Sequence, residues 1–197
     1  MSKDATVFNL TPPTLDYSCV VRNGAGEIVG ELSWNHTTKV VTVNAVYIDG
    51  SAKIEYGYQN VPIQYNGKAT LYLSGTFLVK NTKFCGGISA DGTTCDFNTW
   101  NPNTEMLIVV AAGSGGQVPT GDSIQLVSAY FQGGLWGEQN IELDTTSQTE
   151  GPMIAGTEVV GQKVITHAFP IIEEIPVGAP GVPVVYADPD PPSNYVG

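Results

Sequence analysis

Leu71–Asn81 reads LYLSGTFLVKN, an apolar run that Ser74 and Gly75 interrupt before it resumes. A similar phrase, PMIAGTEVV, occurs at Pro152–Val160. Side chains alternate between the two faces of a strand, so each phrase presents apolar residues to one side. Glycine within a strand pattern often marks a bend or a close approach of another backbone. The phrase therefore predicts strands that bend where a neighbouring segment presses close.

Four runs of the chain can be aligned by this central small residue. In each run the third position is aliphatic and the fifth is Gly or Ala. The aligned runs are Val46–Ile54, Leu71–Val79, Gln125–Gly133 and Pro152–Val160. The spacing from Gly50 to Gly75 nearly equals that from Ala129 to Gly156. The spacing from Gly75 to Ala129 is twice as long, so a further copy is expected between them, and Met106–Ala112 is the candidate.

A repeat of about 20 to 50 residues built from short strands is typical of a solenoid, in which stacked coils together bury an apolar core. The sequence therefore predicts an all-β fold, a single-stranded right-handed parallel β-helix, or β-solenoid. Each small residue would lie beneath its counterpart in the next coil. An antiparallel β-sandwich or barrel stays open as the alternative, because Asn23-Gly24 has a hairpin signal, as Asn66-Gly67 also has.

Three segments are expected along the chain. Residues 1–38, which contain Asn23-Gly24 and Trp34, form an N-terminal cap or hairpin, and residues 39–170 form a β-solenoid of about five coils. Residues 171–197 are rich in proline. Because proline cannot donate to a strand ladder, this tail is expected to run extended along the outside as a strap.

Composition restricts the partners. The net charge is −11, and the chain has eight basic residues among 197. This balance argues against a phosphate backbone or an anionic membrane surface as partner, since both need basic patches. No apolar run is long enough to span a membrane, and the N-terminal stretch MSKDATVFNL lacks the pattern of a signal peptide. No nucleic acid and no membrane insertion are therefore expected.

The three cysteines suggest one disulfide. Cys85 and Cys95 are separated by GGISADGTT, a flexible stretch with a turn signal at Asp91-Gly92. A bridge here is sterically easy, and it would place the protein in an oxidising compartment, either extracellular or in the cell envelope. Two reduced thiols in a cytosolic protein are the alternative. Cys19 is expected to remain unpaired and buried.

Several phrases of the chain resemble the C-terminal region of exported, uncharacterised actinobacterial proteins. These phrases are GTFLVKNTKFC, CDFNTWNPNTEMLIVV, DTTSQTEGPMIAGT and PVGAPGVPVVY, and the resemblance covers roughly residues 40–187. It implies a β-solenoid on an exported or envelope-associated polypeptide. It carries no catalytic signature, so it transfers no functional residues. Residues 1–38 fit the resemblance less well.

The candidate binding residues are aromatic or rich in oxygen donors. Exposed rings can stack on sugars or meet a protein partner, and carboxylate and amide oxygens are the ligands that calcium prefers. The aromatic candidates are Trp100, Tyr130 and Trp136, and the calcium candidates are Asp91, Asp96 and Asn98. Asn, Asp and Thr are also the usual residues of tight loops. No cofactor is expected from the sequence.

No catalytic template fits the sequence. Glycoside hydrolysis needs two carboxylates across a groove, whereas the aligned runs place no second acid beside Asp49. Glu158 falls at an inward position, where an unpaired carboxylate is unfavourable. The sequence therefore predicts a non-enzymatic, secreted or envelope β-solenoid with a structural, adhesive or self-assembling role. Its partner would be a second copy, a surface polysaccharide or a protein. The alternative is a β-helix that binds or cleaves carbohydrate.

Overall fold

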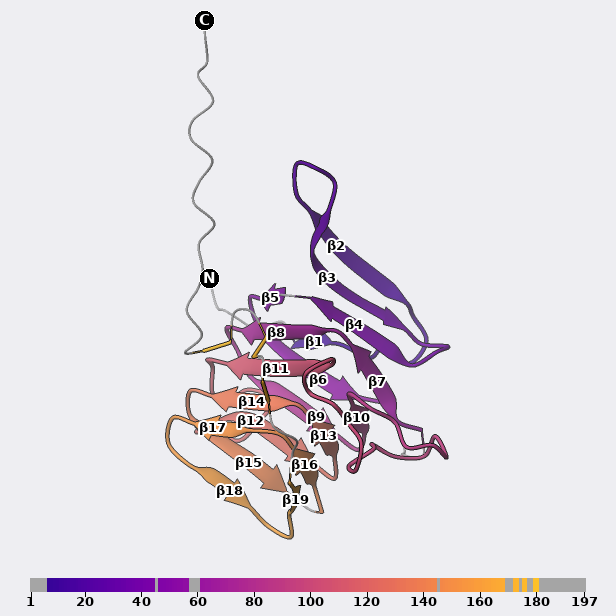
Figure 1. The fold of residues 1–197 in the computed structure, drawn as a ribbon. Helices are drawn as coiled ribbons and strands as arrows, with labels where there is room; N and C mark the ends of the chain where they lie inside the picture. The colour runs from indigo at the N-terminus through magenta and orange to yellow at the C-terminus, as the bar shows by residue number, and fades with distance from the viewer. Residues whose placement is uncertain are drawn as a thin grey trace, which may run out of the picture.

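Nineteen strands and no helix make up the described part of the chain. This computed structural model describes residues 7–44, 46–56, 61–144, 146–168, 172–173, 175–176 and 179–180. The strands form three sheets, named A, B and C, whose strands run one above the other along the length of the molecule (Figure 1). The expectation of an all-β fold is therefore confirmed.

Sheets A and C are parallel throughout. In spatial order, sheet A consists of β1 (Val7–Asn9), β6 (Ser51–Glu55), β9 (Phe77–Lys80), β12 (Asp122–Val127), β15 (Asn140–Asp144) and β18 (Val159–Gly161). Sheet C consists of β5 (Val46–Ile48), β8 (Lys68–Leu73), β11 (Met106–Ala111), β14 (Gly134–Gly137) and β17 (Met153–Ala155).

Sheet B is the longest and combines two kinds of pairing. Its strands are β2 (Tyr17–Arg22), β3 (Ile28–Asn35), β4 (Val40–Asn44), β7 (Ile63–Asn66), β10 (Lys83–Cys85), β13 (Tyr130–Gln132), β16 (Gln148–Glu150) and β19 (Ile165–His167). The pairs β2–β3 and β3–β4 are antiparallel, and the others are parallel. The antiparallel sandwich is therefore not the fold.

From β4 onward the chain visits sheets B, C and A in a fixed order, so each strand pairs with the third strand after it. We call one such set of three strands a coil, beginning with β4, β5 and β6. Because each coil adds one strand to every sheet, the arrangement is consistent with a β-solenoid. The core lies between the sheets and contains the rings of Phe77, Phe84 and Phe131. Phe131 packs on both other rings, with centroids 6.2 and 6.0 Å away.

Two of the three kinds of corner between sheets repeat a backbone conformation. Between sheets A and B the turning residue has a left-handed φ at Asn81, Ser128, Thr146 and Lys163. Between sheets B and C three corners have a glycine with positive φ, at Gly67, Gly133 and Gly151, whereas a long loop joins β10 to β11. A Cβ on Gly151 would lie 2.0 Å from the carbonyl oxygen of Gly133 in the coil before it. Glycine is therefore required at this corner by both conformation and space.

The repeat predicted from the sequence is partly right. Val46 pairs with Leu71, and Met106–Ala111 supplies the expected missing copy by pairing with β8. Gln125 pairs instead with Leu78, so the third aligned run lies in sheets A and B. Through successive strand pairs of sheet C, Leu71 is aligned with Met153. The sequence alignment had placed Pro152 there, so the predicted register is wrong by one position.

The coils also differ in length, which the assumed repeat of about 26 residues did not allow. Ile124 pairs with both Ile141 and Phe77, but the chain between Phe77 and Ile124 is nearly three times as long as that between Ile124 and Ile141. The short coil is therefore the basic unit, and longer coils carry inserted loops.

The N-terminal segment extends two of the sheets. Strands β2 and β3 form a hairpin that projects beyond the coils (Figure 1), and β1 adds a strand to sheet A. The predicted hairpin is confirmed, but Gly26, not Gly24, has the positive φ. Asn66-Gly67 is a corner between sheets and not a hairpin. Trp34 is buried, and its indole N–H donates to the carbonyl oxygen of Pro12 at 2.8 Å.

The described parts of the C-terminal tail lie on the outer face of sheet C. Ala179 is buried against Met106 and Ile108, and Ile172 packs beside them. The amide N–H of Glu173 donates to Asn103 Oδ1 at 2.8 Å. These contacts hold the described residues of the tail against sheet C. Residues 181–197 lie outside the described part of the chain.

Candidate functional site

The most elaborate polar site lies on the outer face of sheet B, beneath a loop that Cys85 and Cys95 close. Five outward residues stand in one column there, one from each of five successive strands. They are Gln64, Cys85, Gln132, Glu150 and His167. Their neighbours in the strands, such as Phe84 and Phe131, point into the core. Strand alternation thus separates this polar ladder from the core.

The predicted disulfide is present. Cys85 and Cys95 are bonded, with their Cα atoms 5.1 Å apart, and Ile88 pairs with Cys95 in an antiparallel bridge. The expected turn at Asp91-Gly92 is also present, since Gly92 has a φ of 71°. Cys19 was expected to be buried, but it is exposed. Its neighbours in β2 are exposed as well, because no other described strand covers that edge of sheet B.

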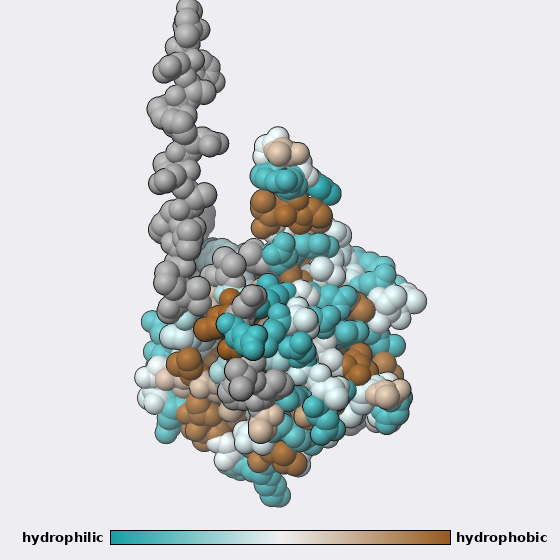
Figure 2. All heavy atoms as spheres, in the orientation of Figure 1, coloured by the Kyte–Doolittle hydropathy of each residue, from teal (hydrophilic) through white to brown (hydrophobic). Residues whose placement is uncertain are grey.

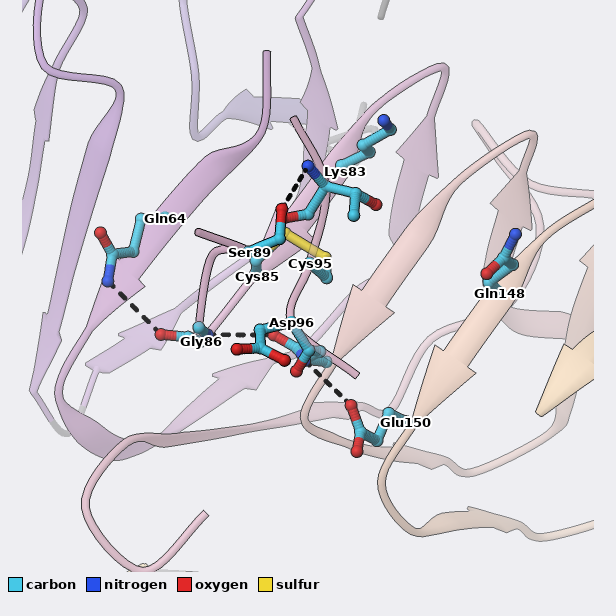
Figure 3. Close-up of a disulfide and its surroundings, with 12 residues drawn as sticks. Gln64, Lys83, Cys85, Gly86, Ser89, Cys95, Asp96, Gln148 and Glu150 are labelled. Carbon is cyan, nitrogen blue, oxygen red and sulfur yellow. Dashed lines mark hydrogen bonds between the residues drawn. A yellow bond between two sulfur atoms is a disulfide. The ribbon is translucent and has the colours of Figure 1, made fainter. Parts of the chain in front are cut away.

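Gln132 fastens the loop to the ladder. Its side chain is fully buried, and its Oε1 accepts the amide N–H of Gly87 at 3.0 Å. Its Nε2 donates to the carbonyl oxygen of Asp96 at 2.7 Å and to Glu150 Oε2 at 2.9 Å. One amide therefore joins the two ends of the loop to the carboxylate in the next coil. Figure 3 shows Gln64 on one side of the loop and Glu150 on the other, with Asp96 between them.

Glu150 is the buried acid of this site, with 2% of its surface exposed. Burial raises the pKa of its carboxyl, and the charge of Asp96 raises it further, while the hydrogen bond from Gln132 lowers it. Removing a carboxylate from water disfavours the charged form. The carboxyl accepts its hydrogen bond from the same amide that holds the loop, so the loop lies over it.

Aromatic rings hold the loop on the side of His167. Phe97 stacks on the His167 ring with centroids 4.0 Å apart, and His167 Nε2 lies 3.1 Å from Gln148 Oε1. Tyr130 lies 6.0 Å from Phe97, and the ammonium of Lys83 lies 5.2 Å from the Tyr130 ring. Tyr130, a predicted binding residue, is half-buried and already takes part in these contacts.

Trp100 is buried, which corrects the expectation of an exposed ring. Only 4% of its surface is exposed, and its indole N–H donates to the carbonyl oxygen of Glu105 at 3.0 Å. A Cβ on Gly86 would lie 2.3 Å from Trp100 Nε1, so the ring packs directly on this glycine. Trp100 anchors the loop from within and offers no exposed face for stacking.

Trp136 lies elsewhere, on the outer face of sheet C. It is half-buried and lines an apolar cavity of about 240 Å³ together with Met106, Ile108, Ile172 and Ile175. The structure therefore does not bring the three predicted aromatic residues together. Trp100 lies inside the loop, Tyr130 on sheet B, and Trp136 beneath the tail.

The residues predicted to bind calcium make local turn contacts. Asp91 accepts a hydrogen bond from Ser89 Oγ at 2.6 Å, and Asp96 accepts the amide N–H groups of Asn98 and Thr99, each at 3.0 Å. Thr99 Oγ1 also donates to Asp96. These hydrogen bonds lower the pKa of both aspartates. Among the residues that the structure describes, no three His, Cys, Asp or Glu side chains gather as a metal site would require.

A polar hollow of about 300 Å³ opens beside the loop. Its lining includes Gln64, Asp96, Thr99, Asn101 and Glu105. Burial raises the pKa of the Glu105 carboxyl. Donors and acceptors converge here in a space suited to a small polar ligand.

Sequence reasoning did not identify Gln64, Gln132 or Glu150 as members of this site. The proximity of Gln132 and Glu150 could have been predicted from their short separation in the sequence, which equals one short coil.

A second acidic pair lies on the outer face of sheet A. Gln125 Nε2 donates to Glu142 Oε2 at 2.6 Å. Burial raises the pKa of Glu142, and a hydrogen bond and charge repulsion from Asp122 raise it further. The two carboxyls thus lie close together on the outer face of sheet A. Glu158, expected to point inward, is exposed in the last coil.

Comparison with known proteins gave no matching family model and no match among curated proteins or solved structures. The described part of the chain contains no helix that is both long and apolar enough to cross a membrane.

Proposed function

We propose that the three sheets close into a right-handed parallel β-helix that serves as a non-enzymatic structural, adhesive or self-assembling module. In this proposal residues 1–38 are the cap, 39–170 the solenoid and 171–197 the strap. The fixed order of sheets B, C and A supports the winding, and the right hand is the one that parallel crossover connections adopt. The resemblance of several phrases to exported actinobacterial proteins would imply the same role.

The observation that carries the proposal is the open end formed by β17, β18 and β19. Each of these strands has an unpaired edge among the described strands. Val159 continues the core column of Ile141, which is fully buried, yet 45% of Val159 is exposed. Ile165, on the outer face of sheet B, is also 50% exposed. An uncovered strand edge with an exposed core residue is a template for another chain.

An oxidising location agrees with the disulfide. The bridge between Cys85 and Cys95 would be reduced in most cytosolic compartments. We therefore propose an extracellular or cell-envelope protein whose open end meets a second copy or a surface polymer. A net charge of −11 favours partners that are neutral or basic.

The test uses two neighbouring residues of β18 that point to opposite faces. Val159 continues a core column, whereas Val160 follows Glu142 on the outer face. We expect the purified chain to associate as its concentration rises, and Val159→Gln to weaken this association. Val160→Gln is the matched control and should leave it unchanged. Sedimentation velocity measures both. Association that is unaffected by Val159→Gln would contradict the role of this end.

Carbohydrate binding is the second candidate, and the polar hollow beside the disulfide loop favours it. Asn101 and Glu105 line this hollow and present side-chain amide and carboxyl groups of the kind that bind sugar hydroxyls. A glycan array would then give hits that Asn101→Ala removes. Saccharides should also alter Trp100 fluorescence, because this residue lines the hollow. An array without hits would eliminate this candidate.

A further inference from the structure

The end of the molecule that carries the N-terminal hairpin has a stepped profile. In the first coil, β4, β5 and β6 belong to sheets B, C and A. Two further strands, β3 and β2, continue sheet B beyond β4, and one strand, β1, continues sheet A beyond β6. No described strand continues sheet C beyond β5. Beyond the first coil, sheet B therefore extends by two strands, sheet A by one and sheet C by none.

An apolar groove of about 380 Å³ occupies the low side of this step. It is lined by Phe8 of β1, by Cys19, Val21 and Leu32 on the inner face of the hairpin, and by Val46 and Ile48 of β5. Val21 is 63% exposed and Tyr47, which also lines the groove, is 65% exposed. In Figure 2 an apolar band crosses the projecting hairpin, where Val20, Val21, Ile28 and Val29 are exposed. The groove thus continues the core without a described strand above it.

The step is complementary to itself under a two-fold axis perpendicular to sheet A. Such a rotation turns the end over and exchanges the sides of sheets B and C. The sheet B side of one copy, which extends by two strands, then lies opposite the sheet C side of the other copy, which extends by none. The two sheet A sides, which extend by one strand each, meet each other. On each side the two copies together supply two strands beyond their first coils. The edges can therefore meet on all three sides at once.

A head-to-tail contact does not fit in this way. At the opposite end, sheets A and C stop at β18 and β17, and sheet B continues for one more strand, β19. If β19 touched β2 of a second copy, the sheet C edges would remain three strands apart, which is about 14 Å. Isologous contacts close, whereas a heterologous contact of this kind would leave the apolar groove open.

We propose that the stepped end is a homodimer interface, in which β1 pairs with β1 of a second copy and each β2 lies against β5 of the other copy. All three edges would then be covered by antiparallel strands, and each hairpin would cover the other copy's groove. The inference shares self-association with the proposed function but uses the opposite end of the molecule. It therefore does not depend on the contact at β17–β19.

Cys19 provides a direct readout, since Cys85 and Cys95 are bonded to each other. The Cys19 thiol lines the groove, so dimerisation should protect it from Ellman's reagent. At about one hundred times the dimer dissociation constant, less than about a tenth of the chains are monomeric, so labelling should slow by about tenfold. At low concentration the labelling rate should return to that of an exposed thiol.

Two substitutions in the hairpin make the test specific. Val21→Glu places a charge in the groove, and we expect it to give a monomer whose Cys19 reacts fast at every concentration. Val29→Glu is the matched control: Val29 is 48% exposed in the same hairpin but does not line the groove, so the dimer should persist. Circular dichroism of Val21→Glu checks that the strands remain folded.

The outcomes separate this inference from the proposed function. Measurements on the Val159→Gln background remove association through β17–β19, so a dimer that persists there and dissociates with Val21→Glu supports the stepped interface alone. Two results would overturn it: a monomeric mass at all concentrations on that background, or a dimer that Val21→Glu leaves intact with Cys19 reacting freely. In the latter case the groove would be vacant or would serve another partner.

Discussion

Gly75 lies directly on Gly50 of the preceding coil. Its amide N–H donates to the carbonyl oxygen of Gly50 at 2.8 Å, and the amide of Gly113 donates in turn to Gly75 at 2.9 Å. A Cβ on Gly75 would lie 2.3 Å from Ser51 Oγ and 2.7 Å from the Gly50 carbonyl carbon. Three successive coils therefore meet at this corner through bare backbone, and no side chain fits between them.

Gly75→Ala is expected to destabilise the protein by about 2 kcal/mol or more, because the added methyl forces adjacent coils apart. Gly24→Ala is the matched control, since a Cβ there meets nothing within 4 Å. It should change stability by less than about 0.5 kcal/mol. Urea unfolding followed by circular dichroism measures both variants. Equal stabilities would show that the corner can relax.

This corner also shows which glycine pairings could be predicted from the sequence. The pairing of Gly50 with Gly75 was predictable, because the phrases around these two glycines match position by position and no inserted loop separates them. Ala129 does not join the column and Gly156 lies beside Gly137, so both assignments were wrong. Apolar alternation is the same in all three sheets, so the pattern alone does not say to which sheet a strand belongs. Inserted loops then shift any fixed spacing.

Replacing both Cys85 and Cys95 by serine should lower the free energy of unfolding by about 3 kcal/mol, because the unfolded chain regains the freedom of the closed loop. Cys19→Ser should have little effect, because this thiol is exposed and makes no disulfide. Urea denaturation with and without reductant provides the comparison. If the reduced wild type were as stable as the oxidised protein, the noncovalent contacts of Gln132, Phe97 and Trp100 would suffice to hold the loop.

Glu150→Gln should stabilise the protein at neutral pH by about 1 kcal/mol for each unit by which folding raises the pKa. Burial raises the folded pKa of Glu150, so its neutral form is favoured in the folded state. Its contribution is then fully present below the unfolded pKa of about 4.3 and is lost as pH rises through the folded value. Melting temperatures of wild type and variant should therefore converge at low pH and separate toward neutral pH.

The site itself was less predictable than the fold. Trp100, Tyr130 and Trp136 were selected because exposed rings can stack on sugars or meet a protein partner. Instead, the structure buries Trp100 in the loop and places Trp136 beneath the tail. Gln132 and Glu150 acquire their roles only through stacking, because each is an ordinary outward residue of its own strand. These two residues lie close together because one short coil separates them in the sequence. Inserted loops lengthen other coils, so this coil length cannot be read from the rest of the sequence.

Ala179→Glu should release the described part of the tail from sheet C. Ala179 is 4% exposed and packs on Met106 and Ile108, so a carboxylate there would be buried without a partner. We expect faster cleavage of the tail by a broad-specificity protease and little change in the unfolding of the coils. Mass spectrometry of timed digests identifies the sites. An unchanged digestion pattern would mean that other contacts, such as that between Glu173 and Asn103, suffice.

The unequal coils set an order of assembly. The turning residues Ser128, Thr146 and Lys163 follow one another at short and nearly equal intervals, whereas the interval from Asn81 to Ser128 is more than twice as long. Closing the longer segment costs about 0.8 kcal/mol more in chain entropy. The C-terminal half should therefore provide the nucleus, onto which earlier coils wind as the disulfide loop is drawn in. The shortest coils would then determine the order in which the other coils form.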